Sequence, residues 1–251
     1  ISGRELSARI RAQLRLKELN ENLAASRAAL QQSLRREREL LAKLRRDNAH
    51  LRVLATTDPL THAQNVRAFQ DILVHSFRVA KRYGQTLSLL MMDADHFKLI
   101  NDSFGHPSGD YVLKELAVIF TQSVRESDVV ARIGGEEFAV ILPDADNEQA
   151  AAFAERIRAE VYARKFIVFK KHIHVTISIG SATYPSDAEI TDPEMLMYFA
   201  DQALLYAKEA GRDRVVRVCD LDMSVRRRMR HQYLQPPWTG QDVPELQPAM
   251  E

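Results

Sequence analysis

Leucines recur every seven positions along the first part of the chain. The column contains Leu16, Leu23, Leu30, Leu44 and Leu51, and only Glu37 interrupts it. Residues 4–55 lack Gly and Pro and are rich in good helix formers. A repeat of seven kept over this length predicts a left-handed coiled coil, and Asn20 and Asn48 in the companion column favour a defined register in a dimer. The alternative is a single amphipathic helix lying on its own domain, for which this helix is too long.

The pattern changes after residue 55. Pro59 disfavours helix at Asp58, and the Thr/Asp cluster at 56–58 is expected to cap a helix over residues 64–83. Apolar and β-branched runs predict strands at 86–93, 129–142 (a hairpin), 172–184 and 214–218. Amphipathic segments predict helices at 107–123, 147–162 and 193–210. Such interspersed strands and helices indicate an α/β or α+β domain with one central sheet.

The ends of the domain follow from the same pattern. The chain divides into a stalk helix at 1–55, a globular domain at 56–219 and a C-terminal extension at 220–251. The extension contains "RRRMR" followed by "QPPWTG", which predicts a helix that runs into disorder. Because the chain opens on Ile1 rather than Met, we expect it to be a fragment of something longer.

Charge is unevenly distributed along the chain. Residues 1–55 carry 13 Lys/Arg against 6 Asp/Glu, while the remainder carries 22 against 28. Because the stalk's cations lie between regular leucines and no aromatic residues interleave them, a solvated coiled-coil surface is favoured over a nucleic-acid site. There is neither an apolar run long enough to span a membrane nor a resemblance to a signal peptide. The single cysteine, Cys219, suits a reducing compartment, so we expect a cytoplasmic protein.

The stretch "RIGGEEFAVILP" (132–143) holds the first candidate chemistry. Gly134 and Gly135 lie between two apolar runs and are typical of a tight hairpin turn, so Glu136 and Glu137 are expected at its tip. The apolar strand at 86–93 likewise ends in Asp93, with Lys98 shortly after. If the two strands are neighbours, the acids could share a divalent cation, and oxygen ligands select Mg²⁺. Taken alone, each acid reads as an ordinary surface residue.

Two further motifs carry polar side chains suited to a nucleotide. "NDSFGHPSGD" (101–110) places Asn101, His106 and Asp110 in a Gly-containing loop, where they could read a base edge. "AKEAGRDR" places Lys208 and Arg212 on one face of a helix end, within reach of one phosphate group. The alternative for this pair is a solvated face whose cations are favoured by the helix dipole.

From Asp58 to Val218 the chain resembles the GGDEF family of diguanylate cyclases. It contains "DPLT", "DADHFKLINDSFGHPSGD", "ARIGGEEFAVILP", "SIGSATYP" and "ADQALLYAKEAGRDRV" in the family's order and spacing. The resemblance implies a ferredoxin-like nucleotidyl-cyclase palm with a central sheet containing antiparallel strands. It also implies a reaction, the condensation of two GTP molecules into cyclic di-GMP and two pyrophosphates, in which two Mg²⁺ ions serve each site and Mn²⁺ can substitute.

The resemblance also implies roles for individual residues. The metal ligands would be Asp93, the carbonyl of Ala94 and Glu136. Glu136 would also accept the proton of the 3′-hydroxyl, with Glu137 beside it, and Lys98 would stabilise the transition state. The residues expected to bind the nucleotide are Asn101 and Asp110 at guanine, His106 nearby, the amides of His96 and Phe97 with Lys208 and Arg212 at the phosphates, and Gly134 and Gly135 beneath it.

An R-x-x-D pair, Arg125 and Asp128, lies shortly before Gly134. In this family the pair at this spacing marks a product-inhibition site, and an Arg fork with a carboxylate suits guanine or phosphate. The chain departs from the family's usual residues at His62, where Gly is usual, and at Asp213, where Asn is usual. These departures put the coupling between stalk and domain in more doubt than the chemistry.

Several readings follow from the resemblance. The main one is a homodimeric cyclase whose coiled coil brings two GTP sites together. A second is a degenerate receptor that binds cyclic di-GMP or GTP without turnover, although such members normally lose the acids kept here as Asp93 and Glu136. A third is a cyclase of altered base preference, against which Asp110 argues. Residues 3–23 also resemble the last helix of a response-regulator receiver running into a linker.

Overall fold

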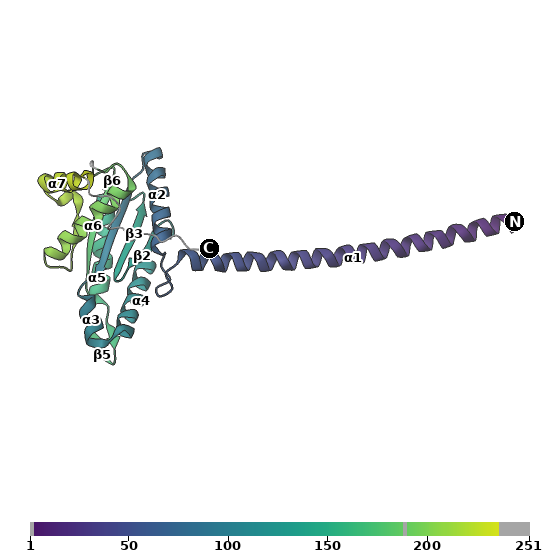
Figure 1. Cartoon of the computed structure of the whole chain (residues 1–251), viewed down its shortest axis with the longest axis horizontal. Coiled ribbons are helices and arrows are strands. Elements are labelled where there is room, and N and C mark those ends of the chain that lie inside the picture. The colour runs from purple at the N-terminus through teal and green to yellow at the C-terminus, as the bar shows by residue number, and fades with distance from the viewer. Residues whose placement is uncertain (1–2, 188–189, 236–251) are drawn as a thin grey trace. The chain divides into compact units, whose positions relative to one another are not determined.

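The computed structural model describes residues 3–187 and 190–235, and the chain separates into two compact units, Ile1–Ala55 and Thr56–Glu251. The described residues of the first unit all belong to α1 (Gly3–Thr56), one continuous helix (Figure 1). Leu16, Leu23, Leu30 and Leu44 are all at least 50% exposed in the single chain. Exposed leucines at this spacing are the residues that a second helix covers in a coiled coil. The side chains of Asn48 and Leu51 lie outside the described residues.

The second unit is built on a five-stranded sheet. Its strands, in spatial order, are β2 (Val129–Gly134), β3 (Glu137–Pro143), β1 (Leu87–Ala94), β6 (Ile177–Tyr184) and β7 (Val215–Arg217). All neighbours are antiparallel except the parallel pair β6–β7. The order of β2, β3, β1 and β6, with helical crossovers, is the ferredoxin-like βαββαβ arrangement, so the predicted fold is confirmed.

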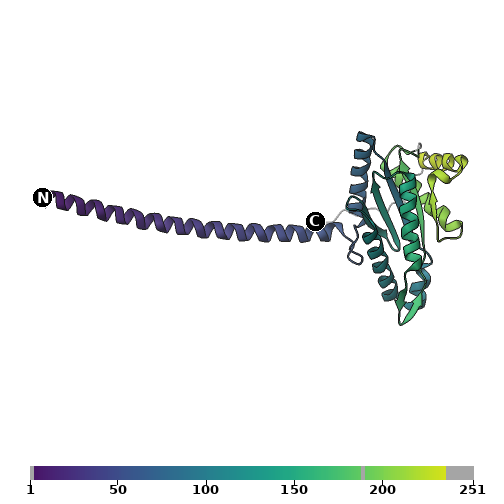
Figure 2. The same ribbon diagram turned by 180° about the vertical axis from the view of Figure 1, so that it is seen from behind.

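Helices cover both faces of the sheet, as the opposite views in Figures 1 and 2 show. They are α2 (Val66–Tyr83), α3 (Phe97–Phe104), α4 (His106–Ser123), α5 (Asn147–Ala163), α6 (Pro193–Glu209) and α7 (Met223–Leu234). In β1, Leu90 and Met92 pack with α4 and α5, whereas Leu89 and Met91 pack with α2 and α6. Because both faces are covered, β1 is buried along its whole length. No helix in the described ranges is long and apolar enough to cross a membrane.

Two segments differ from the sequence expectations. Residues 97–104 form α3, where only a loop was expected before residue 107. The strand expected at 172–184 is interrupted, because Lys171–Ile173 (β5) pairs with Phe166–Val168 (β4) in a separate hairpin. The strand partner of Ile177 is Ala94, the last residue of β1, so the residues just before Ile177 have no neighbouring strand to join.

The start and the end of this unit also refine the expectations. Asn65, not the Thr/Asp cluster, caps α2, because its side chain accepts a hydrogen bond from the amide of Ala68. His62 adopts a φ of 60°, in the left-handed region that favours glycine. A short 3₁₀ turn (Val218–Asp220) leads to α7, the helical part of the predicted extension. Residues 236–251 lie outside the described residues.

Candidate active site

The acids singled out from the sequence meet at one edge of the sheet. Asp93, near the end of β1, lies directly opposite Glu137 in the β1–β3 register. The amide of Ala94 donates to the carbonyl of Glu136 over 3.4 Å. The two strands are therefore neighbours, as a shared site requires. Asp93 and Glu136 come together although 43 positions separate them along the chain, and Ala94 and Glu137 lie beside them.

The turn between β2 and β3 has free space beside its glycines, and hydrogen bonds fix it to the rest of the domain. Gly135 adopts a φ of 49°, and a Cβ atom at Gly134 or Gly135 would meet no atom within 4 Å. The guanidinium of Arg132 donates twice to the carbonyl of Gly135, over 3.0 and 2.7 Å. It also pairs with Asp58 at 3.1 Å, whose carboxylate accepts two hydrogen bonds from Thr61. The turn is thus tied to the first residues of the domain.

The acids are held in a poorly solvated environment. Asp93 is only 8% exposed, and Lys208 Nζ lies 2.8 Å from its Oδ2 atom. Burial raises the pKa of the Asp93 carboxyl, an effect that Lys208 opposes and that the charges of Glu136 and Asp95 reinforce. Burial, followed by the charge of Asp93, likewise raises the pKa of Glu137. Negative charge therefore accumulates here, and Lys208 is the one cation that forms an ion pair with these acids within residues 3–187 and 190–235.

This arrangement fits a magnesium ion. The described residues include no cluster of three or more His, Cys, Asp or Glu side chains that could hold a metal alone. Mg²⁺ normally keeps waters and takes one or two carboxylates together with substrate phosphates. Asp93 and Glu136 with the carbonyl of Ala94 form such an incomplete set, and a divalent cation would offset both the burial of the Asp93 carboxylate, which is the main reason that its pKa is raised, and the added repulsion from Glu136.

Lys208 reaches Asp93 because α6 packs unusually close to β6. A Cβ atom on Gly180 of β6 would lie 2.1 Å from the amide nitrogen of Leu204 and 2.2 Å from the carbonyl oxygen of Ala200, so no other residue fits there. The helix therefore runs against the sheet and presents Lys208, in its last turn, at the edge that holds the acids.

The segment after β1 offers donors for an anion. His96 adopts a φ of 56° immediately before α3, and Phe97 is the first residue of that helix. Within the described residues, neither backbone amide donates a hydrogen bond to another backbone group. Unpaired amides at a helix N-terminus favour phosphate groups. The side chains of His96 and Lys98 are exposed beside them.

The residues expected to read a base lie on helices, not in a loop. Asn101 belongs to α3, while His106 and Asp110 belong to α4, and Gly105 with a φ of 80° separates the two helices. A Cβ atom on Gly109 would lie 2.0 Å from Asn101 Oδ1, so the glycine lets the amide pack against α4. In the described part of the chain these three polar side chains form no hydrogen bond, which leaves them available to a ligand.

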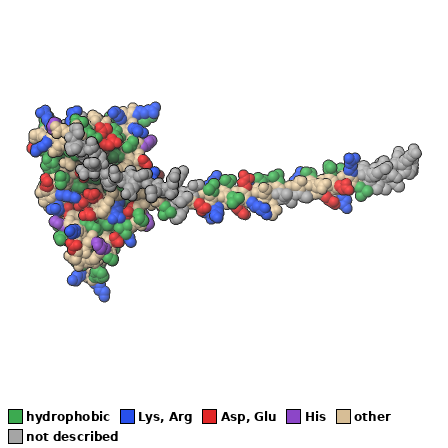
Figure 3. All heavy atoms as spheres, in the orientation of Figure 1, with side chains coloured by type: hydrophobic (Ala, Val, Ile, Leu, Met, Phe, Trp, Pro, Cys, Tyr) green, Lys and Arg blue, Asp and Glu red, His purple; other side chains and the backbone are tan. Residues whose placement is uncertain are grey.

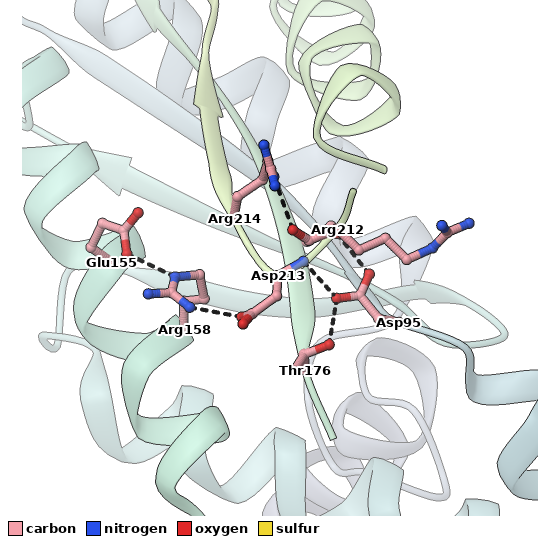
Figure 4. A network of polar contacts seen from close by, with 8 residues as sticks. Asp95, Glu155, Arg158, Thr176, Arg212, Asp213 and Arg214 are labelled. Carbon is pink, nitrogen blue, oxygen red and sulfur yellow. Dashed lines mark hydrogen bonds and ion pairs between the residues drawn. The ribbon is translucent and has the colours of Figure 1, made fainter. Parts of the chain in front are cut away.

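A buried carboxylate, Asp95, holds the loop that carries Arg212 (Figure 4). Asp95 accepts hydrogen bonds from the hydroxyls of Thr176 and Ser178 (2.8 and 2.6 Å) and from the amide of Asp213 (3.0 Å). Arg212 and Asp213 adopt φ values of 63° and 45°. The Asp213 side chain in turn pairs with Arg158 at 2.7 Å. Asp213, one of the departures from the family pattern, thus has a structural partner.

Arg125 and Asp128 lie elsewhere, between α4 and β2. Their main chains form a turn, in which the amide of Arg125 donates to the Asp128 carboxylate over 2.9 Å. Both residues line a pocket of about 350 Å³ that Arg156 of α5 also lines. The Arg156 guanidinium donates to the carbonyl of Ser123 (3.0 Å) and lies 5.0 Å from the centre of the Phe153 ring.

Sequence reasoning missed three of these residues. Asp95 stands two positions from Asp93, but nothing local distinguishes a structural carboxylate from a metal ligand. Arg132 precedes the glycine pair by two positions, and this spacing within a hairpin was the available signal. Arg156 reads as one more cation on an amphipathic helix, and only the packing of α5 reveals its position in the pocket.

Comparison with known proteins gives consistent matches. The family model for "Diguanylate cyclase, GGDEF domain" matches residues 55–214. Diguanylate cyclase A of Treponema denticola is 40% identical over 178 residues, which cover 70% of this chain and 47% of the relative. Response regulator PleD of Caulobacter vibrioides is 36% identical over 218 residues, covering 86% and 43%. The chain thus spans about half the length of these curated relatives.

Solved structures agree with the sequence matches. A crystal structure of the coiled coil and GGDEF domain of DgcB from Caulobacter crescentus, in complex with c-di-GMP, aligns with a TM-score of 0.69 at 32% identity. The alignment covers 75% of this chain and 98% of that one. The similarity therefore includes a protein in which a coiled coil adjoins the same kind of domain.

Proposed function

The chain belongs to the GGDEF family of diguanylate cyclases, and we propose that it condenses two GTP molecules into cyclic di-GMP with release of two pyrophosphates. The observation that carries the proposal is the edge of the sheet where buried Asp93 lies beside Glu136 and 2.8 Å from Lys208. Acids that repel one another beside a cation are suited to a metal-bound triphosphate. Because GTP is a cytoplasmic nucleotide, the proposal places this domain in the cytoplasm.

The chain's residues divide the chemistry between them. In each half-reaction the 3′-oxygen of one GTP bonds to the α-phosphorus of the other, the bond to pyrophosphate breaks, and the hydroxyl proton leaves. Glu136 accepts that proton with Glu137 beside it, and Lys98 stabilises the charge on the phosphoryl group. Asp93, Glu136 and the Ala94 carbonyl would hold Mg²⁺ or Mn²⁺, two ions per site, and the ions would supply positive charge to the triphosphate.

The remaining residues bind the nucleotide. The residues proposed for the phosphates are the amides of His96 and Phe97 and the side chains of Lys208 and Arg212, and those proposed for guanine are Asn101, Asp110 and the nearby His106. Among the residues that the structure describes, no hydrogen bond competes for the side chains of Asn101, His106 and Asp110, which supports their proposed role at guanine. The open space above Gly134 and Gly135 leaves room for the nucleotide to lie against the turn.

We propose that the active form is a homodimer. Each domain holds one GTP, and each 3′-hydroxyl attacks the nucleotide of the partner domain, so two sites must face each other. The exposed leucines of α1 would pair with those of a second chain in a coiled coil, which raises the effective concentration of one site near the other.

The pocket at Arg125 supports product inhibition. The pocket has a volume of about 350 Å³, and Arg125, Asp128 and Arg156 all line it. Guanidinium groups pair with phosphates and guanine acceptors, while a carboxylate accepts from guanine N–H groups. Cyclic di-GMP bound there would restrain the domain without occupying the GTP site.

The rival function is a receptor that binds cyclic di-GMP or GTP without converting it. The retained pair Asp93 and Glu136 argues for turnover, because family members that act only as receptors normally lose these acids. The test is to incubate the purified protein with GTP and Mg²⁺ and to separate the nucleotides by chromatography. Accumulation of cyclic di-GMP supports the cyclase, whereas tight nucleotide binding with GTP left intact would establish the receptor.

A further inference from the structure

Helix α7 lies beyond the segment that the family model matches, which ends at residue 214. One face of α7 is anchored on α6, because Met229 is only 2% exposed and the Tyr233 ring lies 5.5 Å from that of Tyr198. The Tyr233 hydroxyl donates over 2.9 Å to Asp192, the residue that caps α6. The helix is therefore a fixed part of the domain with one defined outer face.

The outer face of α7 has an unusual composition. Met223, Arg227, Arg230 and Leu234 are spaced by four, three and four positions, so they form one stripe along the helix. All four are exposed, Met223 by 60% and Leu234 by 61%. The stripe thus has two cations between two large apolar side chains, and none of the four shares the buried position of Met229.

The basic residues of α7 outnumber its acids. The helix contains four arginines, a histidine and no acid, and in residues 3–187 and 190–235 no carboxylate forms an ion pair with any of these arginines. Blue side chains gather at the upper left of the domain in Figure 3, where Figure 1 draws α7. A solvated helix normally mixes acids with bases on its outer face, so this surface fits an anionic partner.

We propose that α7 docks the domain on a lipid surface rich in anionic headgroups. Three exposed arginines, Arg227, Arg228 and Arg230, followed by the exposed His231, form a basic cluster of the kind that recognises anionic headgroups. Arginine forks bind headgroup phosphates, while Met223 and Leu234 enter the boundary with the acyl chains. A second copy of α7 would repel the first, and a nucleic-acid backbone offers nothing apolar to cover Met223 and Leu234.

The test measures partition of the full chain between water and vesicles by co-sedimentation. Vesicles of phosphatidylcholine alone are compared with vesicles of equal parts phosphatidylcholine and phosphatidylglycerol. The double variant Arg227→Ala/Arg230→Ala should bind the anionic vesicles about 25-fold more weakly, which corresponds to roughly 1 kcal/mol for each arginine. The matched control is Lys170→Ala/Lys171→Ala, which removes the same charge from two exposed residues at the tip of the β4–β5 hairpin and should bind like wild type.

The basic stalk can itself bind anionic vesicles, but every protein compared contains it, so it cannot cause a difference between the two double variants. Equal losses in both double variants, or equal binding of wild type to both kinds of vesicle, would overturn the proposal. A second pair, Met223→Ser/Leu234→Ser, separates lipid from other polyanions. It should weaken binding to anionic vesicles several-fold and leave any binding to duplex DNA unchanged, whereas DNA binding tighter than vesicle binding would assign the surface to nucleic acid instead.

Discussion

Replacing Asp95 with alanine should both destabilise the domain and weaken GTP binding. The carboxylate is 5% exposed and accepts hydrogen bonds from Thr176, Ser178 and the amide of Asp213. A hydrogen bond to a charged group is worth about 1.5–3 kcal/mol, and the two hydroxyls can partly recover by turning to other acceptors. We therefore expect Asp95→Ala to lower the free energy of unfolding by about 3–5 kcal/mol, and Asp95→Asn, which keeps one acceptor oxygen, by about 1–2 kcal/mol.

The effect on GTP follows from the backbone that Asp95 holds. Arg212 and Asp213 both have positive φ, a conformation that costs on the order of 1–3 kcal/mol for each such residue. Without the bond to the Asp213 amide this loop should relax and carry the Arg212 guanidinium away from its proposed position at the phosphates. The KM for GTP should rise about tenfold, equivalent to about 1.4 kcal/mol, more than kcat falls, because Asp93 and Glu136 stay in place.

The assay pairs urea denaturation, followed by circular dichroism, with initial rates over a range of GTP concentrations. Asp102→Ala is the control, since it removes the same charge from an exposed position of α3 and should change neither quantity. If Asp95→Ala unfolds within about 1 kcal/mol of wild type, the carboxylate does not hold these elements together. If the variant is destabilised but its KM for GTP is unchanged, Asp95 stabilises the fold but does not position Arg212.

Three further perturbations test the stalk, the turn anchor and the second pocket. Replacing Leu23, Leu30 and Leu44 with Ala should cost a few kcal/mol of association each and make specific activity steeply dependent on protein concentration, as light scattering beside an activity titration would reveal. Burial raises the pKa of Asp58, but its hydrogen bonds to Thr61 and Arg132 lower the pKa by more, so the folded value lies below the ordinary value of about 3.9. The stabilisation that Asp58 gives is therefore complete above about pH 3.9 and disappears as pH falls through the folded pKa. Urea denaturation at several pH values should show that Asp58→Asn loses this acid dependence. Arg125→Ala should keep the initial rate but abolish the late slowing of progress curves, and equal slowing in both proteins would reduce this residue to part of a turn.

Local sequence patterns predicted the parts of the fold that local physics determines. The buried strand β1 and the Gly134–Gly135 turn were predictable, because unbroken apolar runs and positive φ leave clear signals. Helix α3 was not, since "NDSF" before a glycine reads as a loop. The helix persists because Phe97 and Ile100 are buried in the core.

The site shows the same division. Asp93 lies near the end of a predictable strand and Glu136 lies in a predictable turn, so only the pairing of β1 with β3 was needed to bring them together. Asp95 could not be separated from Asp93 in advance, because its partners Thr176, Ser178 and Asp213 are 81 to 118 positions away along the chain. Long-range packing decides which of two neighbouring acids becomes structural.

The most direct test of the central claim counts products from wild type and Glu136→Gln side by side. The substitution keeps the shape of the side chain but removes its charge and its capacity to accept the 3′-hydroxyl proton. With GTP and Mg²⁺, wild type should yield cyclic di-GMP and two pyrophosphates per molecule of it, while the variant, equally folded by circular dichroism, should be slower by at least about a hundredfold. Near-normal cyclic di-GMP formation by Glu136→Gln, or wild type that binds GTP and forms none, would contradict the account.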